Sequence, residues 1–189
     1  MRRVVGLLLF VVIATLASSA CGGRDASPFT PLDRPPRNLI VIVIDTLRRD
    51  HVGTYGYPRP ITPTIDALAA AGVRADGIAP TSSTASLLTG LHPIRHQAFG
   101  RDDGVPARVE TLAEMLKARG YSTVAGVSSN GWISETYGFE QGFGKFVYTT
   151  DVGFTADRVT ADDVTQEVMR QLPAIAPPFF LYVHYVDPH

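Results

Sequence analysis

Three segments of this 189-residue chain place polar side chains directly after an apolar run or ahead of a helical pattern. Asp45 follows one apolar run, and Asp187 and His189 follow another near the end of the sequence. Between them, Pro80–Gly90 carries hydroxyl groups ahead of a short helical pattern. A carboxylate can bind a hard divalent cation, and a helix N-terminus favours an anion. The three segments together therefore predict a metal and oxyanion site.

Each of these signals also has a plainer interpretation. An aspartate that ends a strand is often only a turn residue. The run Ser82–Ser83–Thr84 more often caps a helix than attacks a substrate. His184 could be an ordinary core histidine, and Asp187 a strand-end turn. From spacing alone, the catalytic and the structural interpretations both stay open.

Buried strands that alternate with helices would bring the three segments to one edge of a sheet. Strands are expected at 39–44, 73–79, 121–127 and 179–186, and helices at 63–71, 84–89, 112–119 and 162–172. Thr62 followed by Pro63 marks one helix start, and Thr111 with Glu114 forms a capping box at another. The pattern predicts an α/β sandwich with a mostly parallel central sheet, whose ligands bind beyond the carboxyl ends of the strands.

The N-terminus reads as a targeting segment rather than as part of the fold. Arg2 and Arg3 precede an apolar stretch and small residues up to Ala20, which predicts a signal peptide over 1–20. Cys21 follows at once and resembles the lipidated cysteine of bacterial lipoproteins, although Ser18 stands where those signals usually carry Leu. The alternative is an ordinary signal peptide with an incidental cysteine.

These features predict an exported protein, either a cell-envelope lipoprotein or a periplasmic or extracellular protein. Residues 21–37 are rich in Gly and Pro and predict a flexible tether, so the folded domain is expected over 38–189. If Cys21 is modified, the membrane is a partner through the lipid anchor.

Composition excludes several classes of function. The chain has 17 basic and 18 acidic residues and 45% hydrophobic residues. The balanced charge argues against a polybasic nucleic-acid binder, and the apolar content argues against disorder. One cysteine excludes an intramolecular disulfide framework and a multi-cysteine zinc site. The sequence carries no signal for an oligomeric state.

Several blocks in order resemble the sulfatase family of the alkaline-phosphatase superfamily. The blocks are NLIVIVIDTLRRDHVGTYGY, ITPTIDALAAAGV, ASLLTGLHPIRH, ETLAEMLKARGYSTVAGVSSN, GFEQGFGKF and HYVDPH. The resemblance implies an alkaline-phosphatase-like sandwich in which Asp45 binds a divalent metal, usually Ca²⁺, with Mn²⁺ and Zn²⁺ as alternatives. It also implies that His189 contacts the transferred sulfate or phosphate group. Thr46 stands where many relatives carry a second Asp, a form that also occurs among related phosphoesterases and phosphoethanolamine transferases.

The nucleophile departs from the sulfatase pattern. Sulfatases convert a Cys or Ser to formylglycine, and counting back from Thr89–Gly90 places Pro80 at that position. Proline has no reactive heteroatom, so formylglycine is not expected. If the loop is one residue shorter, Thr81 takes the role, as threonine does in phosphoethanolamine transferases. Otherwise the site is degenerate.

The resemblance thus implies a metal-dependent sulfatase-family hydrolase of sulfate esters, whose expected partner is a small anionic ester. One alternative is phosphodiester, phosphonate or phosphoethanolamine-type phosphoryl chemistry with Thr81 as nucleophile. Another is a non-catalytic, surface-tethered binding protein on a degenerate sulfatase domain. Because the resemblance places further metal ligands beyond His189, we expect the chain to be an inactive fragment with an incomplete fold. We also expect its last strand to keep an unpaired edge or an exposed apolar face.

Overall fold

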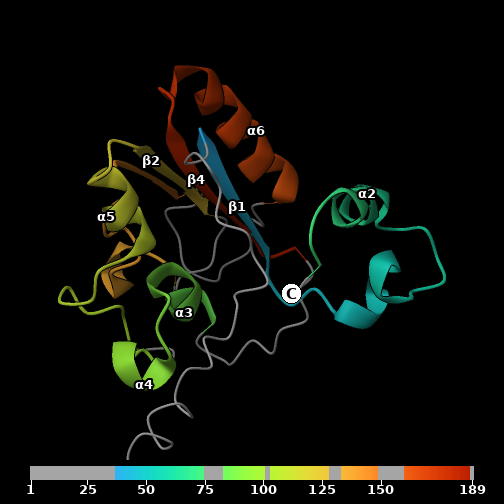
Figure 1. Ribbon diagram of the computed structural model, residues 1–189, viewed down its shortest axis with the longest axis horizontal. Coiled ribbons are helices and arrows are strands. Elements are labelled where there is room, and N and C mark those ends of the chain that lie inside the picture. Colours follow the sequence, from blue (N-terminus) through green and yellow to red (C-terminus); the bar gives the residue numbers. More distant parts are fainter. Residues whose placement is uncertain (1–36, 75–82, 101–102, 128–132, 149–159, 188–189) are drawn as a thin grey trace, which may run out of the picture. The chain divides into compact units, whose positions relative to one another are not determined.

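The computed structural model describes residues 37–74, 83–100, 103–127, 133–148 and 160–187. The proposed signal peptide and tether, Cys21, Thr81 and His189 lie outside these ranges. The described residues form an α/β unit around one sheet (Figure 1). None of the described helices is long and apolar enough to cross a membrane.

The sheet has four strands and every pairing is parallel. The strands are β1 (Asn38–Ile44), β2 (Ser122–Val127), β3 (Lys145–Tyr148) and β4 (Phe179–Tyr185), in the spatial order β1-β4-β2-β3. β4 is a nearly unbroken apolar run, as expected for a central strand covered on both faces. The expectation that the last strand lacks a neighbour was wrong, because β4 is paired along its length with β1 and also with β2.

Five α-helices connect the strands in the described part of the chain. They are α2 (Pro63–Ala71), α3 (Ser83–Thr89), α4 (Pro93–His96), α5 (Leu112–Lys117) and α6 (Ala161–Gln171). The Thr111–Glu114 capping box of α5 is confirmed, and α6 begins with a second box from Thr160 and Asp163. Thr62 is the N-cap of α2 without a side-chain cap bond, since its hydroxyl accepts from Gly53 N–H at 2.9 Å instead.

Alternating side chains of β4 divide the core between the two faces of the sheet. Phe180 and Tyr182 are fully buried in the larger cluster, with residues of α3 and α5. Leu181 and Val183 face the other way and pack with Val164 of α6. The result is the α/β sandwich expected from the sequence, with α6 on one face and α3 and α5 on the other (Figure 1).

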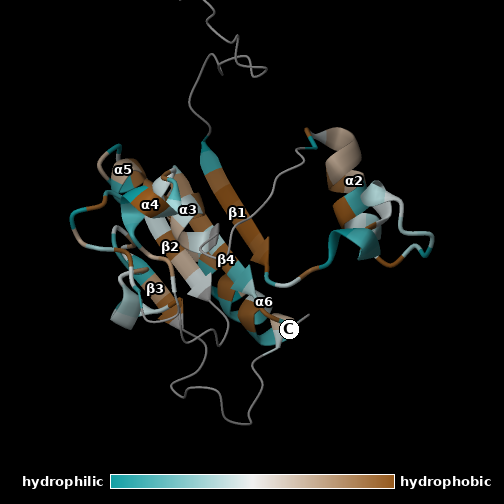
Figure 2. Ribbon diagram, turned by 90° about the horizontal axis from the view of Figure 1, so that it is seen from below, coloured by the Kyte–Doolittle hydropathy of each residue, from teal (hydrophilic) through white to brown (hydrophobic). Residues whose placement is uncertain are grey.

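The two edges of the sheet differ. β3 is four residues long and begins with an exposed lysine, two features that discourage pairing with another chain. β1 is seven residues long and apolar over most of its length (Figure 2), and Ile40 and Ile42 are 50% and 58% exposed. The sheet therefore has one short charged edge and one long apolar edge.

Candidate functional site

The parallel pairing of β1 with β4 sets the position of Asp45. The Asp45 backbone N–H donates to the Tyr185 carbonyl at 2.8 Å, which extends the ladder one residue beyond β1. The carboxylate therefore lies where the two strands end, and its side chain is 35% exposed. A half-buried carboxylate at the carboxyl end of a parallel sheet is where this fold class binds ligands.

Thr46 follows Asp45 with a φ of +56°, in the left-handed region. This conformation is a clear departure for a β-branched residue, because Cβ crowds the backbone there. Such departures concentrate where a surrounding structure fixes a functional side chain. The sequence showed only that Thr46 replaces an aspartate, and it gave no sign of this backbone conformation.

A second group of polar side chains lies beside Asp45, on the same face of the sheet. His184 of β4 is 1% exposed, and its Nδ1 lies 2.7 Å from the Tyr182 hydroxyl. The Thr84 side chain of α3 also hydrogen-bonds to Tyr182. The other ring nitrogen of His184, Nε2, lies 3.7 Å from Asp45 Oδ2. Nε2 has no hydrogen-bond partner among the described residues.

Burial sets the charge of this group. It lowers the pKa of His184, and the nearby Asp45 carboxylate opposes that shift only in part. Burial also raises the pKa of Tyr182, although the Thr84 hydrogen bond works in the opposite direction. Both effects favour the neutral forms, because a charge is costly to hold away from water. Tyr182 and His184 are therefore a neutral pair behind an ionisable carboxylate.

A second fully buried histidine lies in a different corner of the same core. His96 Nε2 is 3.0 Å from the Ser86 hydroxyl, and Nδ1 accepts the Ala98 N–H at 3.0 Å. Since Nδ1 accepts, the proton is on Nε2, and Ser86 is the acceptor. Burial lowers the pKa of His96, and His92 adds to the effect. This arrangement joins α3 to α4 and leaves no base for Ser86, so we read it as structural.

The other residues considered from the sequence lie apart from this site. Asp187 Oδ1 accepts the Ala161 N–H at 2.7 Å and so secures the start of α6. Arg48 donates to exposed Asp50 at 2.5 Å, and Arg95 is exposed on α4. Both arginines are therefore surface residues. The positions proposed for the nucleophile and for the histidine at the transferred group, Thr81 and His189, fall outside the described residues.

The donor set near Asp45 fits only part of a metal site. Within the described ranges, no three His, Cys, Asp or Glu side chains come together to hold an ion. Asp45 supplies carboxylate oxygens of the kind that Ca²⁺ and Mn²⁺ prefer. Carboxylates that bind a metal are themselves usually hydrogen-bonded by an outer shell, and His184 Nε2 lies 3.7 Å from the Asp45 carboxylate. The described residues are thus compatible with one metal ligand and its support.

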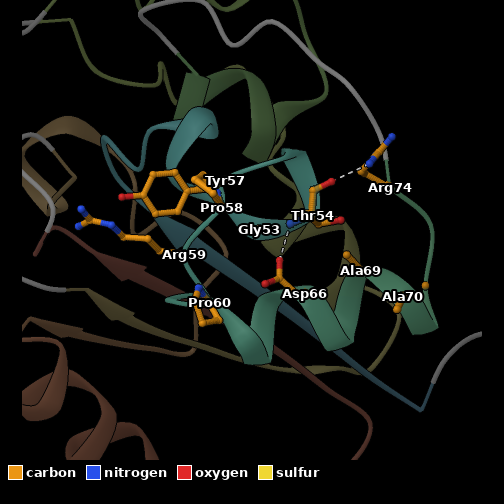
Figure 3. A pocket seen from close by; sticks show the side chains of 11 residues that line it. Gly53, Thr54, Tyr57, Pro58, Arg59, Pro60, Asp66, Ala69, Ala70 and Arg74 are labelled. Carbon is orange, nitrogen blue, oxygen red and sulfur yellow. Dashed lines mark hydrogen bonds between the residues drawn. The ribbon is translucent and has the colours of Figure 1, made fainter.

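An open pocket of about 730 Å³ lies elsewhere, between α2 and the loop before it. Figure 3 shows Asp66 of α2 turned toward Thr54, which Arg74 approaches from the other side. Asp66 accepts the Thr54 N–H at 2.6 Å, and Arg74 donates to the Thr54 carbonyl at 2.8 Å. These polar groups hold the loop together. Among the described residues, neither Asp45 nor His184 nor Asp187 lines this pocket.

Comparisons with known proteins agree with this geometry. The family described as Sulfatase matches residues 37–189. Arylsulfatase A of Homo sapiens is 41% identical over 101 residues, which are 48% of this chain and 20% of that protein. Steryl-sulfatase of Mus musculus is 38% identical over 139 residues, which are 65% of this chain and 22% of that protein. The chain thus spans about a fifth of the length of these curated relatives.

Solved structures show the same fold at lower identity. The phosphonate monoester hydrolase of Agrobacterium radiobacter superposes with a TM-score of 0.63 and 21% identity. The match covers 82% of this chain and 41% of that one. At this identity the likeness concerns the fold alone.

Proposed function

The chain belongs to the sulfatase family, and from that premise we propose that the protein is a metal-dependent hydrolase of sulfate esters. The observation that carries the proposal is the place of Asp45. Its carboxylate lies at the carboxyl end of β1, beside β4, at the edge of the sheet where ligands bind in this fold class. The curated relatives that match this chain are named Arylsulfatase A and Steryl-sulfatase.

In this proposal each of three residues has its own task. Asp45 supplies carboxylate oxygens to a divalent cation, with Ca²⁺ first and Mn²⁺ or Zn²⁺ as alternatives. His189 donates to the oxygens of the transferred group and stabilises their growing negative charge. Thr81 supplies the hydroxyl that attacks the ester. A bound divalent cation would polarise the ester and favour the ionised nucleophile.

A second candidate is hydrolysis or transfer of a phosphodiester or phosphonate. Two features of the sequence favour it, the missing formylglycine pattern and Thr46 in place of a second aspartate. The fold is compatible with such chemistry, since the Agrobacterium radiobacter protein with this fold is a phosphonate monoester hydrolase. A third candidate, a binding protein on a degenerate domain, rests on the same departures from the sulfatase pattern.

Turnover measurements separate the three candidates. The protein, loaded in turn with Ca²⁺, Mn²⁺ and Zn²⁺, is assayed on an aryl sulfate, an aryl phosphodiester and an aryl phosphonate. We expect Asp45→Asn to lower turnover at least about 100-fold, because a metal ligand is lost. Asp50→Asn is the matched control, since Asp50 is an exposed carboxylate paired with Arg48. Measurable turnover that is equal in wild type and Asp45→Asn would refute the site.

The ester that the protein hydrolyses fastest distinguishes a sulfatase from a phosphoryl-transfer enzyme. Preference for the sulfate ester supports the leading proposal, and preference for a phosphorus ester supports the second. Loss of turnover in Thr81→Ala, with Ser82→Ala unchanged, identifies the nucleophile. Saturable binding of an aryl sulfate without turnover under any metal supports the binding protein.

We also propose that residues 1–20 direct export and that Cys21 carries a lipid, with 21–37 as a tether to the domain. The support is the order of basic, apolar and small residues before the chain's single cysteine. In a bacterial host, we expect wild type in the membrane fraction and Cys21→Ser in the soluble envelope fraction. Equal distribution of the two proteins would contradict the lipid anchor.

A further inference from the structure

His184 is a buried histidine with one ring nitrogen bonded and the other facing a carboxylate. Nδ1 lies 2.7 Å from the Tyr182 hydroxyl, whereas Nε2 is buried and has no hydrogen-bond partner among the described residues. The nearest acidic group is Asp45, whose Oδ2 lies 3.7 Å from Nε2. A buried polar nitrogen without a partner is costly, so its presence calls for a reason.

The hydrogen bonds of Tyr182 fix where the His184 proton lies. Tyr182 is fully buried, and a phenol in such a place keeps its proton. That proton needs an acceptor, and His184 Nδ1 at 2.7 Å is one. The Tyr182 oxygen then remains available as an acceptor for the nearby Thr84 hydroxyl. With Nδ1 accepting, the single proton of the neutral imidazole is on Nε2 and faces Asp45.

The donors therefore point in one direction, toward the carboxylate. Tyr182 donates to His184, and the His184 Nε2–H faces Asp45 Oδ2. The distance of 3.7 Å between His184 Nε2 and Asp45 Oδ2 is less than 1 Å longer than a normal hydrogen bond. A small shift of the Asp45 carboxylate, whose side chain is 35% exposed, would close this gap.

We propose that His184 is a positioning residue that holds the Asp45 carboxylate through Nε2–H, with Tyr182 fixing its tautomer. The inference rests on the proposed function in so far as Asp45 is a metal ligand. Carboxylate ligands are usually held by hydrogen bonds from an outer shell, and loss of such a partner typically lowers metal affinity about 10–100-fold. His184 acts on the ester only through Asp45.

Two conservative variants separate this role from simple packing. The amide nitrogen of His184→Gln stands near the place of Nε2 and can still donate to Asp45. The amide of His184→Asn stands near the place of Nδ1 and keeps only the contact with Tyr182. We expect His184→Asn to weaken Mn²⁺ and Zn²⁺ binding about 10–100-fold, and His184→Gln to stay within about threefold of wild type. Titration calorimetry of the full chain measures both.

Nitrogen NMR of the His184 ring gives a readout that needs no metal. The protein labelled with ¹⁵N at histidine should show the Nε2-protonated tautomer, and Tyr182→Phe should convert it to a mixture. His96→Gln is the control, because it removes a buried histidine far from Asp45 in sequence and should leave the His184 signal unchanged. A wild-type His184 protonated on Nδ1 overturns the proposal.

The outcomes also distinguish this inference from the proposed function. Equal metal affinity of wild type and Asp45→Asn refutes the metal site itself, and the tautomer still decides the His184 arrangement. Weakened binding in Asp45→Asn, with His184→Asn equal to wild type, leaves the metal site standing and overturns the positioning role. Equal losses in His184→Asn and His184→Gln indicate packing and overturn it too.

Discussion

His96 and His184 are both almost completely buried in one core, yet they differ in what their ring nitrogens do. His96 uses both, one with Ser86 and one with the Ala98 N–H. His184 uses one with Tyr182 and leaves the other facing Asp45. A histidine with both nitrogens bonded links elements of the fold, whereas a histidine with one nitrogen left over is available to a neighbouring site. Burial alone does not separate these two roles, but a full account of hydrogen bonds does.

The largest expected difference between the two histidines is in stability. His96→Leu leaves the Ala98 N–H and the Ser86 hydroxyl without their partner, and we expect a loss of about 3 kcal/mol in the free energy of unfolding. His184→Leu keeps a similar volume but leaves the buried Tyr182 hydroxyl without its Nδ1 partner, one orphaned group where His96→Leu leaves two, so we expect a smaller loss of about 2 kcal/mol. Urea unfolding of both variants measures the difference. Equal losses would remove the basis of the comparison.

The pH dependence of stability is the next expected effect. The folded-state pKa of His96 is lowered by burial, so the unfolded chain takes up its proton first as the pH falls. The ordinary pKa of histidine in an unfolded chain is about 6.5. Above that pH, neutral His96 makes its full contribution to the free energy of unfolding. Below it the contribution declines until the pH reaches the lowered pKa of the folded state. The slope contributed by one proton cannot exceed about 1.4 kcal/mol per pH unit.

Unfolding curves between pH 7.5 and 5 test this effect. His96→Gln should show a shallower slope than wild type, and His92→Gln is the control because His92 is exposed on the neighbouring turn. If the free energy of unfolding of wild type and of His96→Gln changed equally with pH, His96 would have the same protonation in the folded and the unfolded state.

The smallest expected effect concerns the residues that follow Asp45 and His96. Thr46 and Gln97 both have positive φ, but only Thr46 is β-branched. Glycine removes the Cβ crowding, so Thr46→Gly should gain about 1 kcal/mol in the free energy of unfolding. Gln97→Gly should gain less, because glutamine is unbranched and its contact with Arg108 is lost. Thermal unfolding compares the two, and a destabilised Thr46→Gly would mean that the threonine side chain holds this turn.

The elements with clear local signals were predictable from the sequence. Apolar runs placed β1 and β4 within about a residue of their observed bounds, and the Thr111–Glu114 pair placed the start of α5. β3 was not predicted, because its four residues are too few for a periodic pattern. Val73 and Arg74 are not in a strand, although one was expected from residue 73, and 75–79 lie outside the described residues.

The site was predictable to the extent that it depends on strand ends. Asp45 followed from the end of an apolar run, and its nearness to β4 followed from parallel pairing. The Tyr182–His184 arrangement could not be predicted, because a hydrogen bond between alternate residues of a strand depends on rotamers and on the helix packed over them. His96 was missed for a similar reason, since α4 has only four residues and Ile94 and Arg95 beside it are exposed.

The central place of β4 also sets the time at which the sheet can form. β1 and β4 are bridged by a hydrogen bond between residues 141 positions apart. At a ribosomal rate of about 5–20 residues per second, roughly 7 to 28 s of synthesis separate the two strands. Throughout that interval the isoleucine-rich β1 has no neighbour, and β2 is without the strand that joins it to β1. The sheet formed by the described strands therefore closes only after β4 has been made, and until then the nascent chain remains open to chaperones, to proteases and to other copies of itself.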